Sequence, residues 1–141
     1  MKVLVIDGQG GRMGKSIIEQ LKKNRDTPGA FDLYGIGTNS NATLAMMKAG
    51  ADYGATGENP IIVNSSNADI IVGPIGIVIA NSLLGEITPA IATAVGASPA
   101  YKILIPINRC NHMIIGCKEA PLSEYLQQVC QEVFCKINEF L

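Results

Sequence analysis

Three absences in the sequence narrow the function of this protein. Its most apolar stretch, residues 70–84, is broken by Gly73-Pro74 and Asn81-Ser82, so it falls short of the ~18 uninterrupted apolar residues that a membrane span requires. It has no excess of one charge, because 11 basic residues face 12 acidic ones without a long run of either sign. We therefore expect neither nucleic acid nor a membrane as a partner. It has a single histidine, His112, so any imidazole-based mechanism must use that residue.

The composition indicates one small domain. A chain of 141 residues has the usual size of a single domain and no room for a large second, substrate-binding domain. Apolar residues make up 48% of it and charged residues only 16%, so we expect some apolar surface to lie between subunits of a homo-oligomer. The four cysteines fall in the last third, and the chain opens on a strand-like run rather than a basic and apolar leader. We therefore expect a reduced, cytoplasmic protein.

Short β-branched runs alternate with helical patterns along the chain. This alternation predicts an α/β fold, a Rossmann-like three-layer sandwich whose sheet is mostly parallel. Thr88 and Pro89 mark a cap and a first helical residue, and Ser40 or Asn41 is expected to cap an earlier helix that stops at Gly50. We predict strands at residues 3–6, 33–36, 51–56, 68–72, 103–105 and 113–115, and helices at residues 14–23, 39–48, 89–97 and 122–140.

The loop after the first strand, "GQGGRMGKS", first suggests the phosphate loop of ATPases. That loop requires G-x-x-x-x-G-K-[ST], but counting back from Gly14-Lys15-Ser16 places Gln9 where the first glycine must stand. The strand-like run "ADIIV" also ends in Gly73-Pro74 rather than in the aspartate that would hold a magnesium ion. Both observations disfavour the ATPase interpretation.

A dinucleotide-binding loop fits this segment better. Gly8, Gly11 and Gly14 stand at a spacing of three, which provides a sharp turn, a close approach of backbone to a pyrophosphate, and tight packing of helix against strand. The bend between the first strand and its helix, together with the first helix turn, is expected to point unpaired amides at a phosphate, aided by the charges of Arg12 and Lys15. The alternative is a tight turn without a ligand. The residues expected to contact NAD(P) or another nucleotide here are Gly8, Gln9, Gly10, Gly11, Arg12, Met13, Gly14 and Lys15.

The string from Gly8 to Gly14, "GQGGRMG", resembles the G-x-G-G-R-M-G loop of the dihydrodipicolinate reductases, which bind NADH or NADPH there. The resemblance covers about the first twenty residues and does not extend to the substrate domain of those enzymes. Asp7 departs from it, because a carboxylate beside a pyrophosphate repels the pyrophosphate unless a cation intervenes. A second departure follows the second strand, where Thr38 and Asn39 stand instead of the acidic residue that usually binds ribose hydroxyls.

Other candidate residues follow strands or lie in turns. Gly73 and Pro74 could lie flat against a base or a ribose, or could simply end a strand. Glu58 and Glu86 lie in glycine-flanked turns, where a carboxylate binds a hydroxyl or a metal, or caps a helix.

The cysteines and the histidine invite a further hypothesis. A thiolate–imidazole site would use Cys110 and His112 together with Asp7 or Glu58. Cys110, His112 and Cys117 offer only three metal ligands, so we expect no metal site.

Over nearly its full length the chain resembles a family of short bacterial proteins catalogued only as a domain of unknown function. The resemblance rests on "VIDGQGG", "TGEN", "DIIVGPIGI", "ANSLLGE" and "ILIPIN". It implies a bacterial, cytosolic, Rossmann-like protein and no particular reaction. Three hypotheses remain: a nucleotide-binding or sensing module, a small oligomeric enzyme that uses Cys110 or His112, and a structural protein without a ligand.

Overall fold

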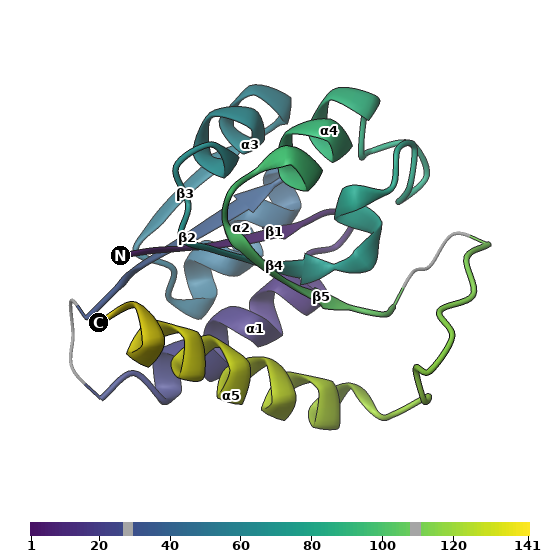
Figure 1. Ribbon diagram of the computed structural model, residues 1–141. Coiled ribbons are helices and arrows are strands. Elements are labelled where there is room, and N and C mark those ends of the chain that lie inside the picture. The colour runs from purple at the N-terminus through teal and green to yellow at the C-terminus, as the bar shows by residue number, and fades with distance from the viewer. Residues whose placement is uncertain (27–29, 108–110) are drawn as a thin grey trace.

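A five-stranded parallel sheet forms the centre of the described part of the molecule (Figure 1). The computed structural model describes residues 1–26, 30–107 and 111–141. The strands are β1 (Lys2–Asp7), β2 (Asp32–Gly37), β3 (Tyr53–Thr56), β4 (Ile70–Pro74) and β5 (Tyr101–Ile105). The helices are α1 (Arg12–Lys23), α2 (Ser40–Ala49), α3 (Glu58–Ser65), the 3-10 helix η1 (Ile75–Val78), α4 (Pro89–Ala97) and α5 (Leu122–Phe140).

The order of the strands is β3-β2-β1-β4-β5, and each neighbouring pair runs parallel. The chain winds outward from β1 to β3 and then returns to the other side of β1 to add β4 and β5. The order therefore reverses beside β1, and the crevice at the carboxyl end of such a reversal is where open α/β sheets bind ligands. The predicted Rossmann-like fold is confirmed, with a sheet that is parallel throughout.

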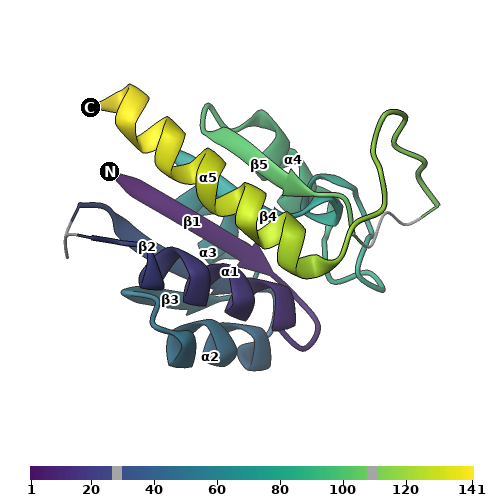
Figure 2. The same cartoon turned by 90° about the horizontal axis from the view of Figure 1, so that it is seen from below.

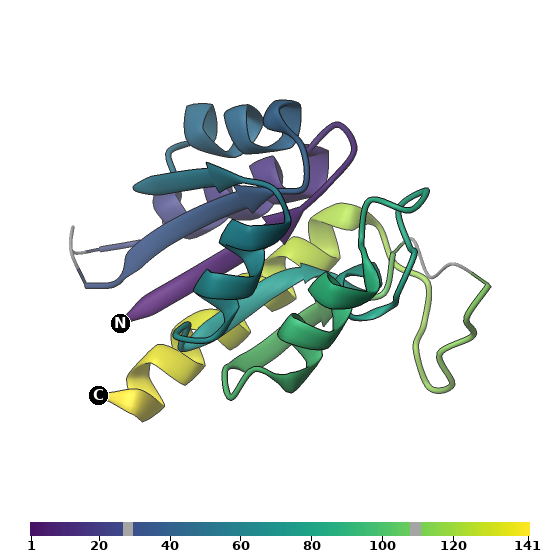
Figure 3. The ribbon, with the colours of Figure 1, turned by 90° about the horizontal axis from the view of Figure 1, so that it is seen from above.

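Helices cover both faces of the sheet and enclose two apolar cores. α1, α2 and α5 lie on the face seen in Figure 2, and α3 and α4 lie on the opposite face, seen in Figure 3. Val3 and Val5 of β1 pack into the first core, while Leu4 and Ile6 pack into the second. All four side chains are fully buried, which explains why the strand is a continuous apolar run without polar alternation.

Most of the predicted elements are present. The predicted strand at 51–56 is β3, and the long helix has the predicted bounds, Leu122–Phe140. The Thr88 hydroxyl accepts a hydrogen bond from the Ile91 amide at 3.1 Å, and Pro89 follows as the first helical residue, as predicted. Gly50 ends α2 in the left-handed conformation, with φ of 116°.

Two predictions about the elements are wrong. Residues 113–115 form no strand, and the side chains of Met113 and Ile115 are 77% and 91% exposed. A strand needs a neighbour for its backbone hydrogen bonds, and local sequence cannot show whether one is in reach. The helix α3 was not predicted, and Glu58, expected in a glycine-flanked turn, is its first residue. Pro60 lies in its first turn. A proline is tolerated in the first helical turn, where the amide has no partner within the helix.

Two boundaries also differ from the predictions. The cap of α2 is Asn39, whose Oδ1 accepts from the Ala42 amide at 2.9 Å, rather than Ser40 or Asn41. β4 ends two residues later than predicted, because Gly73 and Pro74 still pair with β5.

The longest helix, α5, is amphipathic. It packs against α1 and buries Leu126, Val129, Val133 and Ile137, while its opposite face carries glutamine and glutamate. Across the three described ranges, no helix combines the length and the apolar character needed to cross a membrane.

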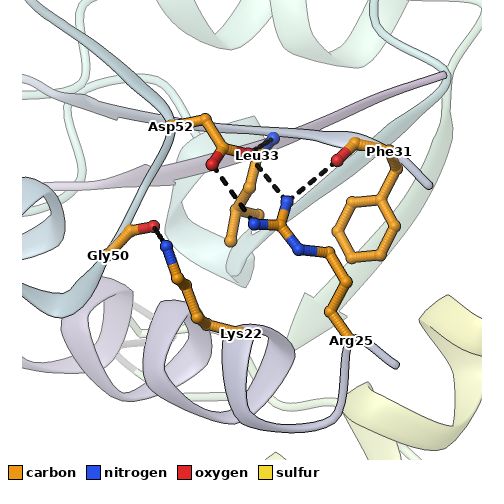
Figure 4. Close-up of polar contacts among 6 residues, drawn as sticks. All are labelled: Lys22, Arg25, Phe31, Leu33, Gly50 and Asp52. Atoms are coloured by element: carbon orange, nitrogen blue, oxygen red, sulfur yellow. Dashed lines mark hydrogen bonds and ion pairs between the residues drawn. The ribbon is translucent and has the colours of Figure 1, made fainter. Parts of the chain in front are cut away.

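An ion pair between Arg25, after α1, and Asp52, before β3, also reaches the start of β2 through hydrogen bonds (Figure 4). The Arg25 guanidinium donates to the two Asp52 carboxylate oxygens at 2.8 and 3.2 Å, and to the Phe31 carbonyl at 3.0 Å. Asp52 also accepts from the Leu33 amide at 2.9 Å. The Arg25 hydrogen bond, opposed by burial, holds the pKa of Asp52 below its ordinary value of 3.8. This network holds β2 in register at the end of the sheet opposite the β1–α1 loop.

Candidate functional site

The β1–α1 loop, residues 8–11, is a tight turn at the carboxyl end of β1. The Gly11 amide donates to the Gly8 carbonyl at 2.9 Å, and Gly11 has the left-handed φ of 71°. An added Cβ at Gly11 would lie 2.7 Å from the Ala42 Cα, and one at Gly14 would lie 2.6 Å from the Met46 Sδ. Both glycines therefore let α1 pack closely against α2.

Gly10 is different from the other glycines of this turn. Its φ is not left-handed, and a Cβ built on it would meet no atom within 4 Å. At Gly8, by contrast, a Cβ would lie 2.7 Å from the Thr38 Oγ1. Neither backbone conformation nor internal packing requires a glycine at position 10. Close approach of a ligand to the backbone is another physical reason for a glycine at such a place.

Asp7 caps α1 from the end of β1. Its carboxylate accepts from the Gly8 amide at 2.8 Å and from the Gly14 amide at 2.7 Å. The side chain is buried, and burial raises the pKa of Asp7 above its ordinary value against the lowering effect of these hydrogen bonds. The expectation of unpaired amides is therefore wrong for Gly8 and Gly14. The first turn of α1 has no acidic residue of its own. Asp7, the last residue of β1, caps the helix instead.

Glu86 reaches the same loop from the segment between η1 and α4. Its Oε1 accepts from the Thr38 hydroxyl at 2.6 Å, the Asn39 amide group at 2.8 Å and the Gln9 backbone amide at 3.0 Å. The Gln9 amide, which was also expected to be unpaired, is thus engaged. Burial opposes the charge of Glu86, but these three hydrogen bonds outweigh it and keep the pKa of Glu86 below its ordinary value of 4.5.

The segment that carries Glu86, residues 79–87, has an unusual backbone. Asn81, Leu83 and Leu84 have φ values of 65°, 55° and 55°, in the left-handed region that costs residues other than glycine of order 1–3 kcal/mol each. Leu83 is buried against the loop, and the Ser82 hydroxyl donates to the Gly76 carbonyl. These contacts hold the segment in a fixed shape that delivers Glu86 to the end of β2.

In the described part of the chain, one backbone amide of the loop and one at the start of α1 remain open. Within the ranges that the structure describes, the amides of Gly10 and Arg12 have no hydrogen-bond partner. Arg12 and Lys15 are both exposed on the first turn of α1, where Lys15 lies 3.9 Å from Glu19 in a weak surface pair. At the N-terminus of α1, the Gly14 amide therefore donates to the buried Asp7, while the Arg12 amide and the Arg12 and Lys15 side chains face the solvent.

Gly73 and Pro74 have a structural role in the sheet. Both are buried, and a Cβ at Gly73 would lie 2.5 Å from the Ile6 carbonyl oxygen. The glycine therefore lets β4 pack closely against β1. These contacts favour the strand-ending alternative over a platform for a base, because neither residue presents an open surface.

The other candidates that the structure describes lie on separate elements. Glu58 begins α3 after the edge strand β3, two strands away from β1, and it is exposed. Asn108, Arg109 and Cys110 lie outside the described residues, so the thiolate–imidazole hypothesis stays a prediction. His112 and Cys117 belong to the segment between β5 and α5, and Asp7 is the last residue of β1. The described residues contain no group of three or more side chains able to hold a metal ion.

The parts of this site are evident in the sequence, but their arrangement is not. Glu86 was predicted as a carboxylate able to bind a hydroxyl, and Thr38 and Asn39 replace the usual acidic residue after β2. The structure joins the two observations, because Glu86 lies where that acidic residue was expected. No local signal could have linked positions 48 residues apart.

The fold and the loop define a Rossmann-like α/β protein with an acidic group at the end of its second strand. The chain belongs to the family described as a domain of unknown function, DUF3842, whose sequence profile matches residues 2–138. No curated protein and no solved structure matches the chain.

Proposed function

We propose that the β1–α1 loop, the end of β2 and Glu86 together bind a nucleotide, and that NAD(H) fits better than NADP(H). One observation carries the proposal: the carboxylate of Glu86 is hydrogen-bonded both to the loop, at Gln9, and to the end of β2, at Thr38 and Asn39. In dinucleotide-binding folds, a carboxylate at this place accepts the hydroxyls of the adenosine ribose.

The second oxygen of Glu86 has room for a ligand. Oε1 accepts three hydrogen bonds. Oε2 accepts only one, the second branch of the bifurcated hydrogen bond from the Gln9 amide, at 3.1 Å. A carboxylate has about four acceptor positions, so Oε2 can accept further hydroxyl donors. Because Thr38 and Asn39 fix Oε1, this oxygen is held in place before a ligand arrives, which reduces the entropy that binding would cost.

The phosphate of the nucleotide would lie beside Gly10. The open amides of Gly10 and Arg12 donate there, and the exposed Arg12 and Lys15 side chains supply positive charge. Asp7 already uses part of the positive end of α1. Phosphate binding therefore depends more on these two side chains than it would in a loop without that carboxylate.

Charge favours a ribose with free hydroxyls over a phosphorylated one. A 2′-phosphate adds about 1.5 to 2 negative charges, and Glu86 is ionised. Two unit charges 4 Å apart repel by about 4 kcal/mol at an effective dielectric constant of 20. Glu86 is half-buried, so solvent screens part of this repulsion, and we expect a preference for NAD(H) of at least about tenfold, or 1.4 kcal/mol.

Thermal unfolding in the presence of nucleotides tests the proposal. NAD⁺ at 100 times its dissociation constant should raise the free energy of unfolding by about 2.7 kcal/mol. Gly10→Val should abolish this shift without lowering the melting temperature of the free protein, because the added side chain points into open space. Gly96→Val is the matched control, since Gly96 also faces open space but lies in α4. If no nucleotide among NAD(H), NADP(H), ATP, GTP and FAD shifts the melting temperature, the structural hypothesis replaces this one.

A reduced, cytoplasmic setting is consistent with this proposal. Cys117, Cys130 and Cys135 are free thiols in the described part of the chain. A reducing compartment keeps such thiols reduced.

A further inference from the structure

Leu84 combines two features that are unfavourable in the free protein. Its side chain is 97% exposed, more than that of any other large apolar residue in the described part of the chain. Its backbone has the left-handed φ of 55°, which leucine adopts rarely. An exposed leucine gains nothing from the hydrophobic effect until another group covers it. Neither packing nor backbone conformation within the chain therefore favours leucine at this position.

Two neighbouring residues share this backbone conformation, and the chain accounts for both. Leu83 is 4% exposed, and its Cδ1 lies 3.0 Å from a Cβ built on Gly8, so its side chain packs on the β1–α1 loop. Asn81 belongs to a residue type that tolerates the left-handed region. Leu84 differs from both, because its side chain points to solvent at a position where asparagine or glycine would be less strained.

Main-chain hydrogen bonds hold Leu84 in place without help from its side chain. The Gly85 amide donates to the Ser82 carbonyl at 3.1 Å. The Glu86 amide donates to the Leu83 carbonyl, also at 3.1 Å. These bonds close the turn on both sides of residue 84. A change of the Leu84 side chain should therefore leave the turn, and with it the Glu86 carboxylate, in place.

The segment that carries Leu84 lies beside the proposed nucleotide site. The chain between η1 and α4 projects past the carboxyl end of the sheet, next to the β1–α1 loop (Figures 2 and 3). Leu84 stands two residues before Glu86, so their Cα atoms are at most roughly 7 Å apart. Glu86 is the residue proposed to accept the ribose hydroxyls, and the base of a nucleotide is bonded to that same ribose. The base therefore comes within reach of the Leu84 side chain.

We infer that Leu84 packs on a face of the base, and that this contact makes the site select a nucleotide over the corresponding sugar phosphate. The inference rests on the proposed function, because it takes the ribose to be bound at Glu86. Leucine offers an apolar surface without a hydrogen-bonding group, so it contacts the flat face of the base and does not read its edge. The contact should therefore strengthen the binding of adenine and guanine nucleotides alike.

Two ligands that differ only in the base test this inference. Adenosine monophosphate and ribose 5-phosphate share the sugar and the phosphate, and chemical-shift titration by NMR on the full chain measures dissociation constants into the millimolar range. Leu84→Asn should weaken the binding of adenosine monophosphate about fivefold through lost contact area, and leave that of ribose 5-phosphate unchanged. The variant should not lower the melting temperature, because asparagine adopts the left-handed region more readily than leucine.

Leu84→Met is the matched control for the side chain. Methionine keeps a flexible apolar group at the same strained position, so this variant should bind both ligands as the wild type does.

Three results would overturn the inference. In the first, Leu84→Asn binds adenosine monophosphate as tightly as the wild type, as expected of a leucine that serves a protein partner instead. In the second, it weakens both ligands equally, which would mean that the substitution moves Glu86. The proposed function survives both of these results, because the wild type still binds the ligands. In the third, the wild type binds neither ligand, and the proposed nucleotide site fails together with the role of Leu84.

Discussion

Removal of the Asp7 carboxylate should destabilise the fold strongly. In Asp7→Ala the Gly8 and Gly14 amides, which now donate to Asp7 at 2.8 and 2.7 Å, lose their acceptor inside the protein. An unsatisfied buried donor costs about 1–3 kcal/mol, so the two together cost about 2–6 kcal/mol. Burial of the charge, which raises the pKa of Asp7, offsets part of this loss. We expect a net destabilisation of about 2–4 kcal/mol at pH 7.

Urea unfolding followed by circular dichroism measures this loss. With a slope of about 1–3 kcal/mol per molar urea, the midpoint should fall by about 1–2 M. Asp69→Ala is the matched control, because Asp69 accepts the Lys2 amide at 2.6 Å on the exposed surface, where water replaces the lost acceptor. It should change stability by less than about 0.5 kcal/mol. If Asp7→Ala is no more harmful than Asp69→Ala, Asp7 does not cap α1 in the way described.

Three further changes test the structural account by urea unfolding. The pKa of Asp52 is lowered in the folded protein, so its contribution to stability is present above its ordinary pKa of 3.8 and is lost as the pH falls through the folded-state value. Asp52→Asn should therefore lose stability at pH 7 and show a shallower further loss in acid, whereas a parallel pH profile would contradict the Arg25 pairing. Thr88→Ala should lose about 1 kcal/mol through the helix cap, and no loss would mean that the hydrogen bond to Ile91 is not formed. Gly96→Ala should gain about 0.5–1 kcal/mol, because its Cβ meets nothing within 4 Å in α4, and a loss would show a hidden contact there.

The sequence predicted most of the fold because the helices and strands have strong local signals. β1 is a continuous apolar run that can only be buried on both faces, and the Thr88-Pro89 pair marks the start of α4. The strand predicted at 113–115 failed for a non-local reason. Its residues favour a strand, but a strand forms only against a neighbour, and no strand among the described residues pairs with residues 113–115.

The candidate site was harder to predict because it depends on long-range contacts. The turn at Gly8 and the packing role of Gly14 follow from the spacing of the glycines alone. The hydrogen bonds of Asp7 and Glu86 to the loop do not, since Glu86 lies 77 residues after Gln9 and reaches it through a segment with three residues other than glycine at positive φ. Such a backbone is sparsely populated and has no reliable sequence signal.

Isothermal titration of NAD⁺ into the wild-type protein and into Glu86→Gln tests directly whether the Glu86 carboxylate binds the nucleotide. The substitution keeps the size of the side chain but removes the charge that would accept the ribose hydroxyls. A hydrogen bond to a charged group contributes about 1.5–3 kcal/mol, so binding to one site should weaken at least tenfold in the variant. The preference over NADP⁺ should shrink with it. Equal affinity of both proteins for NAD⁺, or no binding by the wild type, would contradict the proposed role of Glu86.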